Sequence, residues 1–280
     1  MREDWIKQIE DTTARFRAGE AEVGRVFFSK PRPLAQHVKW LKHQISREAR
    51  NLREASNHYV KDLVDRTDDS VTRERLIQRA KEDYQEYRHY GMLAYLYEGI
   101  TGNKLQWKAL LDEAQHADWW LPRREREVRR RLAETSQLHN AAGAFNSGGG
   151  GSLFYGFIGL KGGDYEELLS EVSKIVLHDE MDHGASEGRD LLYPLVRTEE
   201  DFNNALAAIR EFSTVRLEDR NRQFSDVLSD NRLRAIIEGD IEPATTDLLA
   251  EASHDLMDDE TWFERFHGTN KPLSSVSVQS

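Results

Sequence analysis

Residues 176–184 read VLHDEMDHG, and they place five ionisable side chains within six consecutive positions. They continue a run in which Leu169 and Val172 recur at helical spacing, so the charges follow an apolar helix face. Within the stretch, Glu180 and His183 are three residues apart, on one face, where a carboxylate and an imidazole can bind one metal ion. The stretch therefore predicts a helix that carries metal ligands toward the protein interior.

The composition of the chain narrows the class of protein. Its 280 residues are 38% hydrophobic, which is enough for a core, and the absence of cysteine excludes disulfides and thiolate metal sites. The first 30 residues are charged throughout and no apolar run approaches the ~20 residues of a membrane span, so we expect a cytoplasmic protein without membrane contact. The net charge of −11 argues against nucleic acid as a partner and favours a small molecule or a protein.

The pattern of the chain predicts a nearly all-α protein. Only six prolines interrupt long tracts rich in Glu, Arg, Leu and Ala. Helices are expected over about 33–65, 71–98, 104–120 and from 123 to as far as 160, followed by one from Asp164 and one capped by Thr198 and Asp201. We expect one domain over residues 1–280, with a bundle at about 33–190, C-terminal helices at about 198–267 and a loose tail at 268–280.

Glu-x-x-His pairs are more frequent than composition predicts. With 28 glutamates and 10 histidines in 280 residues, chance gives about one pair. The chain has five: Glu86/His89, Glu113/His116, Glu180/His183, Glu251/His254 and Glu264/His267. The last two lie in a weakly patterned tail and are interpreted as chance, and the second is set aside because residues 100–122 are needed as a crossover.

Hairpin geometry identifies a partner for the first pair. In an antiparallel hairpin, residues at one level are equally far from the turn, and Glu48 precedes Thr67 by as many positions as Glu86 follows it. Glu48 also lies between Ile45 and Leu52 on an apolar stripe, where an unpaired charge is expensive to bury. Glu48, Glu86 and His89 are therefore predicted to converge.

The same test leaves two arrangements open for the other pair. The residue that lies as far before the turn of its hairpin as Glu180 lies after it is Asn146. The amide oxygen of Asn146 supplies no negative charge. Glu134 can serve instead only if its helix ends near Ser147 and the apolar residues 152–160 are a loop insertion. The sixth ligand is thus Glu134 or Asn146.

At this point the chain resembles the ferritin-like di-iron oxidases and oxygenases. The resemblance covers about residues 41–189 and rests on Gln85-Glu-Tyr-Arg-His89 and Asp179-Glu-Met-Asp-His183. It implies a four-helix bundle with a helical crossover, ligands Glu48, Glu86, His89, Glu180 and His183, and Asp179 as a partner that fixes the orientation of His89. The chain departs from the family where Asn146 and Ser147 precede the glycines, because a ligand Glu would stand there.

Such ligands suit Fe(II) and O2, because carboxylates and imidazoles leave open positions on the metal. The expected function is an O2-dependent non-haem iron oxidoreductase that hydroxylates, desaturates, cleaves or N-oxygenates a small organic substrate. Two iron ions are expected, with one ion or manganese as alternatives, and an external electron donor and a homodimer are candidate partners. The alternative functions are a haem-oxygenase-like di-iron oxidase and a non-catalytic iron-binding or assembly protein.

Overall fold

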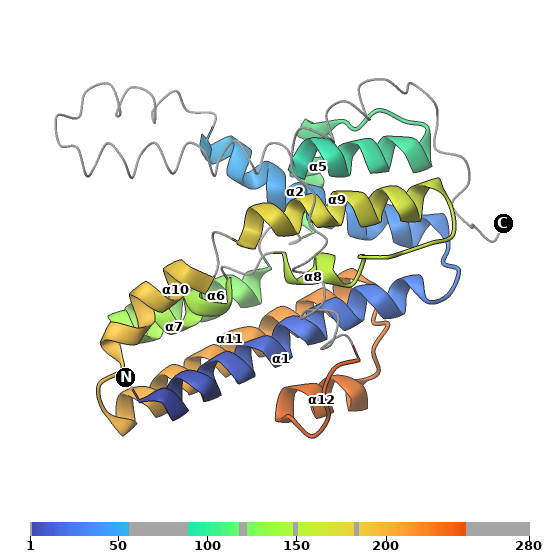
Figure 1. Ribbon diagram of the computed structural model, residues 1–280. Coiled ribbons are helices and arrows are strands. Elements are labelled where there is room, and N and C mark those ends of the chain that lie inside the picture. Colours follow the sequence, from blue (N-terminus) through green and yellow to red (C-terminus); the bar gives the residue numbers. More distant parts are fainter. Residues whose placement is uncertain (1, 56–88, 118–121, 148–150, 182–184, 245–280) are drawn as a thin grey trace. The chain divides into compact units, whose positions relative to one another are not determined.

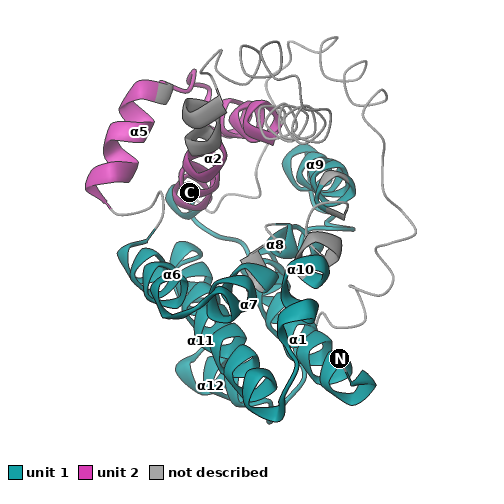
Figure 2. Ribbon diagram, turned by 90° about the vertical axis from the view of Figure 1, so that its left-hand side faces the viewer, with its two compact units in different colours: residues 1–36, 122–280 teal, residues 37–121 magenta. Residues whose placement is uncertain are grey.

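The computed structural model describes residues 2–55, 89–117, 122–147, 151–181 and 185–244 (Figure 1). These residues form helices and turns, with no strand among them, so the prediction of an all-α protein is confirmed for this part of the chain. The chain divides into two compact units, unit 1 with residues 1–36 and 122–280 and unit 2 with residues 37–121 (Figure 2). The ferritin-like bundle and the single domain stay predictions.

Two long helices, α1 (Glu3–Phe28) and α11 (Glu199–Gln223), form the centre of unit 1. Near their starts, Trp5 stacks on Phe202 with ring centroids 5.2 Å apart, and near their ends Phe27 meets Phe224 edge-on at 5.1 Å. Because start meets start and end meets end, the two helices run parallel (Figure 1). The sequence interpretation, which began its first helix at about residue 33, did not predict α1.

The other helices of unit 1 are shorter. They are α6 (Arg123–Thr135), α7 (Gln137–Ser147), α8 (Ser152–Tyr155), α9 (Asp164–Met181), α10 (Ala185–Leu192), the 3₁₀ helix η1 (Tyr193–Leu195) and α12 (Asp230–Glu238). A continuous helix from 123 to 160 is wrong, because Ser136 is extended, with φ −170° and ψ 167°, and separates α6 from α7. The alternative, in which the helix of Glu134 continues to Ser147 and residues 152–160 form a loop, is only partly right: α7 ends at Ser147, but Glu134 lies on the separate helix α6 and residues 152–155 form α8.

The amphipathic pattern of α11 decides how unit 1 packs. Thr198 and Asp201 form the predicted capping box: the Thr198 hydroxyl accepts from the Asp201 amide at 3.1 Å, and the Asp201 carboxylate accepts from the Thr198 amide at 2.9 Å. The predicted apolar face of α11 lies in a core shared with α1, α6, α7 and α10. Its residues there are Phe202, Ala205, Ile209 and Phe212.

Helix α12 runs antiparallel to α1. Glu22 receives two hydrogen bonds from Arg232, at 2.8 and 2.9 Å, whereas Arg15, earlier on α1, donates to the carbonyl of Ile237, later on α12. Gly19 lies between these contacts, and a Cβ there would stand only 3.1 Å from the side chain of Ile236. The absence of a side chain at Gly19 therefore allows the two helices to approach closely.

Unit 2 contains α2 (Leu34–Ala55) from His37 onward, a helical segment at 89–101 and α5 (Trp107–His116). Leu41 and Ile45, predicted on the apolar stripe of α2, are fully buried. The segment at 89–101 ends before Gly102, which has a φ of +67° that favours glycine. The charged side chains of α5 face solvent.

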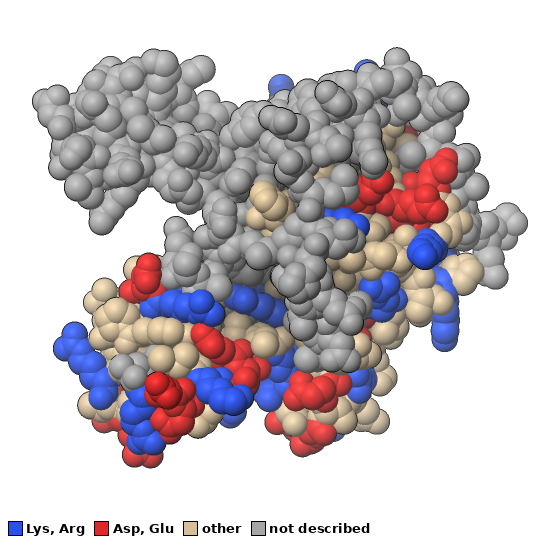
Figure 3. Space-filling model, viewed as in Figure 1, with Lys and Arg blue, Asp and Glu red and all other residues tan. Residues whose placement is uncertain are grey.

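The described surface of unit 1 carries charges of both signs, as the lower part of Figure 3 shows. Some pair along their own helix, such as Lys7 with Asp11 and Arg123 with Glu127, at 2.6 and 2.7 Å. Exposed pairs of this kind contribute little to stability. In the part of the chain that the structure describes, no helix combines the length and apolar character needed to cross a membrane.

Candidate functional site

The structure brings together two of the predicted ligands in unit 2. Glu48, on α2, and His89, at the start of the segment 89–101, place the Oε2 and Nδ1 atoms 3.8 Å apart. The His89 side chain is 2% exposed and that of Glu48 is 13% exposed. Helix α2 and the helical segment 89–101 therefore bring a carboxylate and an imidazole close together.

The two atoms lie slightly farther apart than two ligands of one metal ion would. A distance of 3.8 Å is too long for a hydrogen bond. Donors that each bind one metal at ~2.1 Å lie about 3.0–3.4 Å apart, so a shift of a few tenths of an ångström would bring the pair into range. Gln44, one turn before Glu48, donates from Nε2 to Glu48 Oε1 at 2.8 Å and fixes the orientation of the carboxylate.

Glu180 lies in unit 1, near the end of α9, with its side chain half-buried. A Cβ on Gly151, which precedes α8, would stand 3.2 Å from Glu180 Cβ and 3.3 Å from Cγ. The lack of a side chain at Gly151 thus leaves room for the stem of Glu180. The apolar residues predicted on α9, Leu169, Val172 and Val176, are buried, so the helix has the predicted core face.

A buried group of charges surrounds this part of unit 1. Glu20 on α1 is 1% exposed, and its Oε2 accepts from Arg216 at 3.1 Å and from Arg220 at 3.4 Å. Burial opposes the positive charge of Arg216, but the carboxylates of Glu20, Glu125 and Glu180 more than offset it and raise the pKa of Arg216. The Glu180 carboxylate therefore acts on a buried guanidinium of α11.

The remaining predicted site residues are placed as follows. Glu86 and His183 lie outside the described residues, as do the side chains of Asp179 and Asn146. Glu134 is exposed on α6 and accepts from Arg130 at 3.0 Å, which gives no support to a ligand role. No group of three or more His, Cys, Asp or Glu side chains arranged to hold a metal occurs among the described residues.

The rival and chance pairs also have defined places. Glu113 and His116 are both exposed on α5; Glu113 binds Lys42 at 2.6 Å, and the His116 ring bonds the Asp112 carbonyl at 2.7 Å. Each side chain thus has a local role on the surface. The pairs at 251/254 and 264/267 lie outside the described residues.

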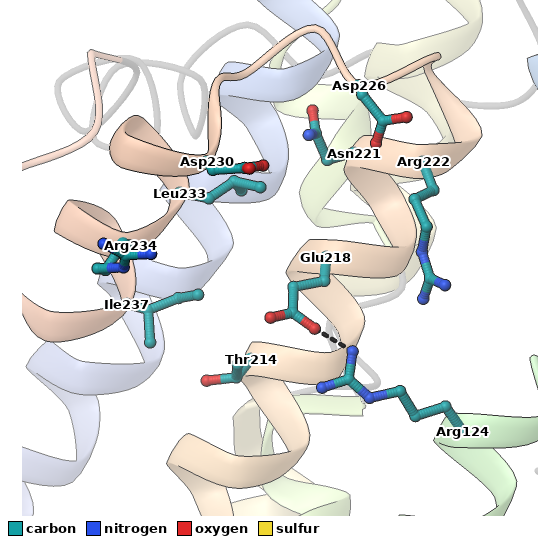
Figure 4. Close-up of a pocket in the computed structure, with 10 residues that line it drawn as sticks. All are labelled: Arg124, Thr214, Glu218, Asn221, Arg222, Asp226, Asp230, Leu233, Arg234 and Ile237. Atoms are coloured by element: carbon teal, nitrogen blue, oxygen red, sulfur yellow. Dashed lines mark hydrogen bonds and ion pairs between the residues drawn. The ribbon is translucent and has the colours of Figure 1, made fainter.

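A pocket of about 530 Å³ lies between the end of α11 and α12, with Arg124 of α6 at its edge (Figure 4). Arg124 and Glu218 form an ion pair across part of it. Asn221 supports its wall, because its side chain both donates to and accepts from the Leu228 backbone, at 3.0 and 2.9 Å. Its lining consists of Arg124, Thr214, Glu218, Asn221, Arg222, Asp226, Asp230, Leu233, Arg234 and Ile237, so none of the predicted metal ligands takes part.

Comparison with known proteins gives no relative for this chain. No family model, no curated protein and no solved structure matches it. The functional argument therefore rests on the residues of the chain and on their geometry.

Sequence reasoning missed the buried charges of α1 and α11. Glu20 lies in a segment for which only the charge is noted, and Arg216 and Arg220 follow the apolar face of α11 without a recognised motif. The spacing of small residues did indicate a packed helix here. Ala18, Ala21 and Gly24 recur at helical intervals around Glu20, and such a face indicates a helix that is packed on both sides.

Proposed function

We propose that this chain is an O2-dependent non-haem iron oxidoreductase that acts on a small organic substrate. The observation that carries the proposal is the contact between Glu48 and His89 in unit 2. A largely buried carboxylate beside a buried imidazole favours a cation in addition to the one hydrogen bond from Gln44, and carboxylate and imidazole are donor types that Fe(II) accepts.

Each predicted ligand has a role in this proposal. Glu48, with Glu86 and His89, would hold an ion in unit 2, and Glu180 with His183 would supply ligands from unit 1. Bound iron would supply the reduction of O2 and the oxidation of the substrate. The chain itself orients the ligands: Gln44 holds the Glu48 carboxylate, and Gly151 leaves space for Glu180.

The two groups of ligands differ in their electrostatic surroundings. Arg216 already places positive charge near Glu180, whereas Glu48 accepts a hydrogen bond from the neutral side chain of Gln44. A cation therefore gains less from Glu180 than from Glu48. We expect iron to bind first and most tightly through Glu48, Glu86 and His89, with a second ion binding more weakly.

Two measurements test the proposal. The first is the iron content per chain after anaerobic Fe(II) loading, and the second is the optical change when O2 is then added. Glu48→Gln and His89→Gln should each lose the tightly bound iron and the optical change. The matched control is the exposed pair on α5, where Glu113→Gln with His116→Gln should leave both readings unchanged. Equal iron content in all variants, or none in the parent chain, would contradict an iron site at Glu48.

The same experiment separates catalysis from simple iron binding. If the parent binds iron that depends on Glu48 but shows no optical change with O2, the chain is an iron-binding protein and the oxidoreductase proposal fails.

A further inference from the structure

The pocket between α11 and α12 has a floor and a rim of different character (Figure 4). In its deeper part Asn221 and Leu233 are buried, and Thr214 and Ile237 are half-buried, so the floor offers two apolar side chains beside two polar ones. Its volume of about 530 Å³ lies within the range of small-molecule sites. The exposed residues of the rim are all charged: Arg124, Arg222, Asp226, Asp230 and Arg234.

Two carboxylates of the rim, those of Asp226 and Asp230, have no partner within the part of the chain that the structure describes. Asp226 is held in place by its backbone, which has a φ of 55° after a φ of 63° at Ser225. The Asp226 amide donates to the Asn221 carbonyl at 2.8 Å, and the Asn221 side chain binds the backbone of Leu228. The loop that carries Asp226 is therefore positioned before any ligand arrives.

Most of the positive charge on the rim is already paired. Arg124 binds Glu218, and Arg222 binds Asp219, which lies outside the pocket. Only Arg234 has no partner among the described residues. Two unpaired carboxylates thus stand against one unpaired guanidinium, and the pocket favours a cation over an anion.

We infer that this pocket binds a small organic amine, with its ammonium group at Asp226 and Asp230 and its alkyl chain on Leu233 and Ile237. An ammonium group donates charge-assisted hydrogen bonds to carboxylates. A hydrated metal ion would gain nothing from the apolar side chains, whereas an alkyl chain is removed from water by them. None of the predicted metal ligands lines the pocket, so this inference does not depend on the proposed function.

Calorimetric titration of the metal-free full chain with butylammonium chloride at pH 7 tests the site. Sodium chloride at equal ionic strength, neutral 1-butanol and magnesium chloride are the references. Butylammonium should bind in a saturable manner, and it should raise the melting temperature beyond the salt effect. Butanol lacks the charge and magnesium lacks the alkyl chain, so each should bind at least about 10-fold more weakly.

Variants of the rim locate the binding. Asp226→Asn and Asp230→Asn should each weaken butylammonium binding about 3- to 10-fold, and asparagine tolerates the left-handed backbone at position 226. Arg234→Gln should strengthen binding about 2- to 5-fold, because it removes a nearby positive charge. The matched control is Glu238→Gln, which removes an exposed acid of α12 outside the pocket and should leave the dissociation constant unchanged.

Four outcomes would overturn the site. They are no saturable binding of butylammonium by the parent chain, equal affinity for butanol, equal affinity for magnesium, or equal weakening by Glu238→Gln and Asp230→Asn. Equal affinity for magnesium would show a divalent-cation site in its place. If Asp230→Asn does not fold, Asp226→Asn decides, and an unchanged dissociation constant in that variant overturns the site.

Discussion

Replacing Glu20 by glutamine tests how much the buried charges contribute to unit 1. Glu20 is 1% exposed and accepts two hydrogen bonds, from Arg216 and Arg220, which are 6% and 3% exposed. Glu20→Gln keeps the shape of the side chain but removes the carboxylate that accepts hydrogen bonds from both buried guanidinium groups. Each charge-assisted hydrogen bond contributes about 1.5–3 kcal/mol, and breaking a buried pair from one side costs about 3–5 kcal/mol.

The expected loss is large compared with the stability of a typical protein. A free energy of unfolding of about 5–15 kcal/mol would fall by about 3–5 kcal/mol. For a unit of this size the melting temperature should drop by about 2–4 °C per kcal/mol, or about 6–20 °C in total. Urea unfolding at neutral pH, followed by far-ultraviolet circular dichroism, measures the change in free energy, and an unchanged slope would show that the unfolded state is not altered.

Two controls make the test specific. Glu134→Gln removes an exposed carboxylate that pairs with Arg130 along α6, and it should cost no more than about 0.5 kcal/mol. Adding Arg216→Met to Glu20→Gln should recover part of the loss, since one uncompensated charge is removed. If Glu20→Gln costs no more than Glu134→Gln, the guanidinium groups reach water and the buried network does not stabilise unit 1.

Three further predictions concern packing and pH. Gly156→Ala should lower the free energy of unfolding by about 1–3 kcal/mol or more in urea titrations, because its Cβ would overlap the backbone of Ala21. Gly91→Ala should raise it by about 0.5–1 kcal/mol, since a Cβ at this helical position meets nothing within 4 Å, and a lower value would contradict the open space seen there. Tyr193→Phe should cost about 1 kcal/mol near pH 8, because the Tyr193 hydroxyl donates to Glu10 Oε1 at 2.9 Å. Burial, and then the hydrogen bond to Glu10, raise the pKa of Tyr193 to about 12, so its stabilisation is present below the ordinary pKa near 10 and is lost as the pH rises to about 12. Urea midpoints measured from pH 9 to 12 should therefore fall less in Tyr193→Phe than in the parent, and parallel curves would refute the assignment.

Helices with a strong local signal could be predicted from the sequence. Thr198 and Asp201 satisfy each other's backbone and depend on no distant residue, so their spacing was sufficient to place the start of α11. The stripe from Phe202 to Phe212 was similarly clear. In contrast, α1 packs on both sides, against α8 and α11, and buries Glu20 and Glu22 as well as apolar groups, so its pattern lacked the simple division into a polar and an apolar face.

The contact between Glu48 and His89 could be predicted from their spacing along the chain, whereas the metal site itself stays a prediction. Glu48 and His89 lie within one continuous unit, and counting residues from a turn was enough to bring them together. The break at Ser136 depends on how α6 and α7 pack, since Ser136 itself is compatible with either a helix or a turn.

The parallel pairing of α1 with α11 affects the order in which the chain can fold during synthesis. Trp5 can stack on Phe202, and Glu20 can bind Arg216, only after these partners have been synthesised. About 200 residues must therefore leave the ribosome before α1 acquires its main partner. Unit 2 is one continuous segment, residues 37–121, and its contacts can close while the rest of unit 1 is still being made. The apolar side of α1 is therefore exposed for most of translation, and a chaperone that binds short hydrophobic segments would be expected to recognise the region from Trp5 to Phe28.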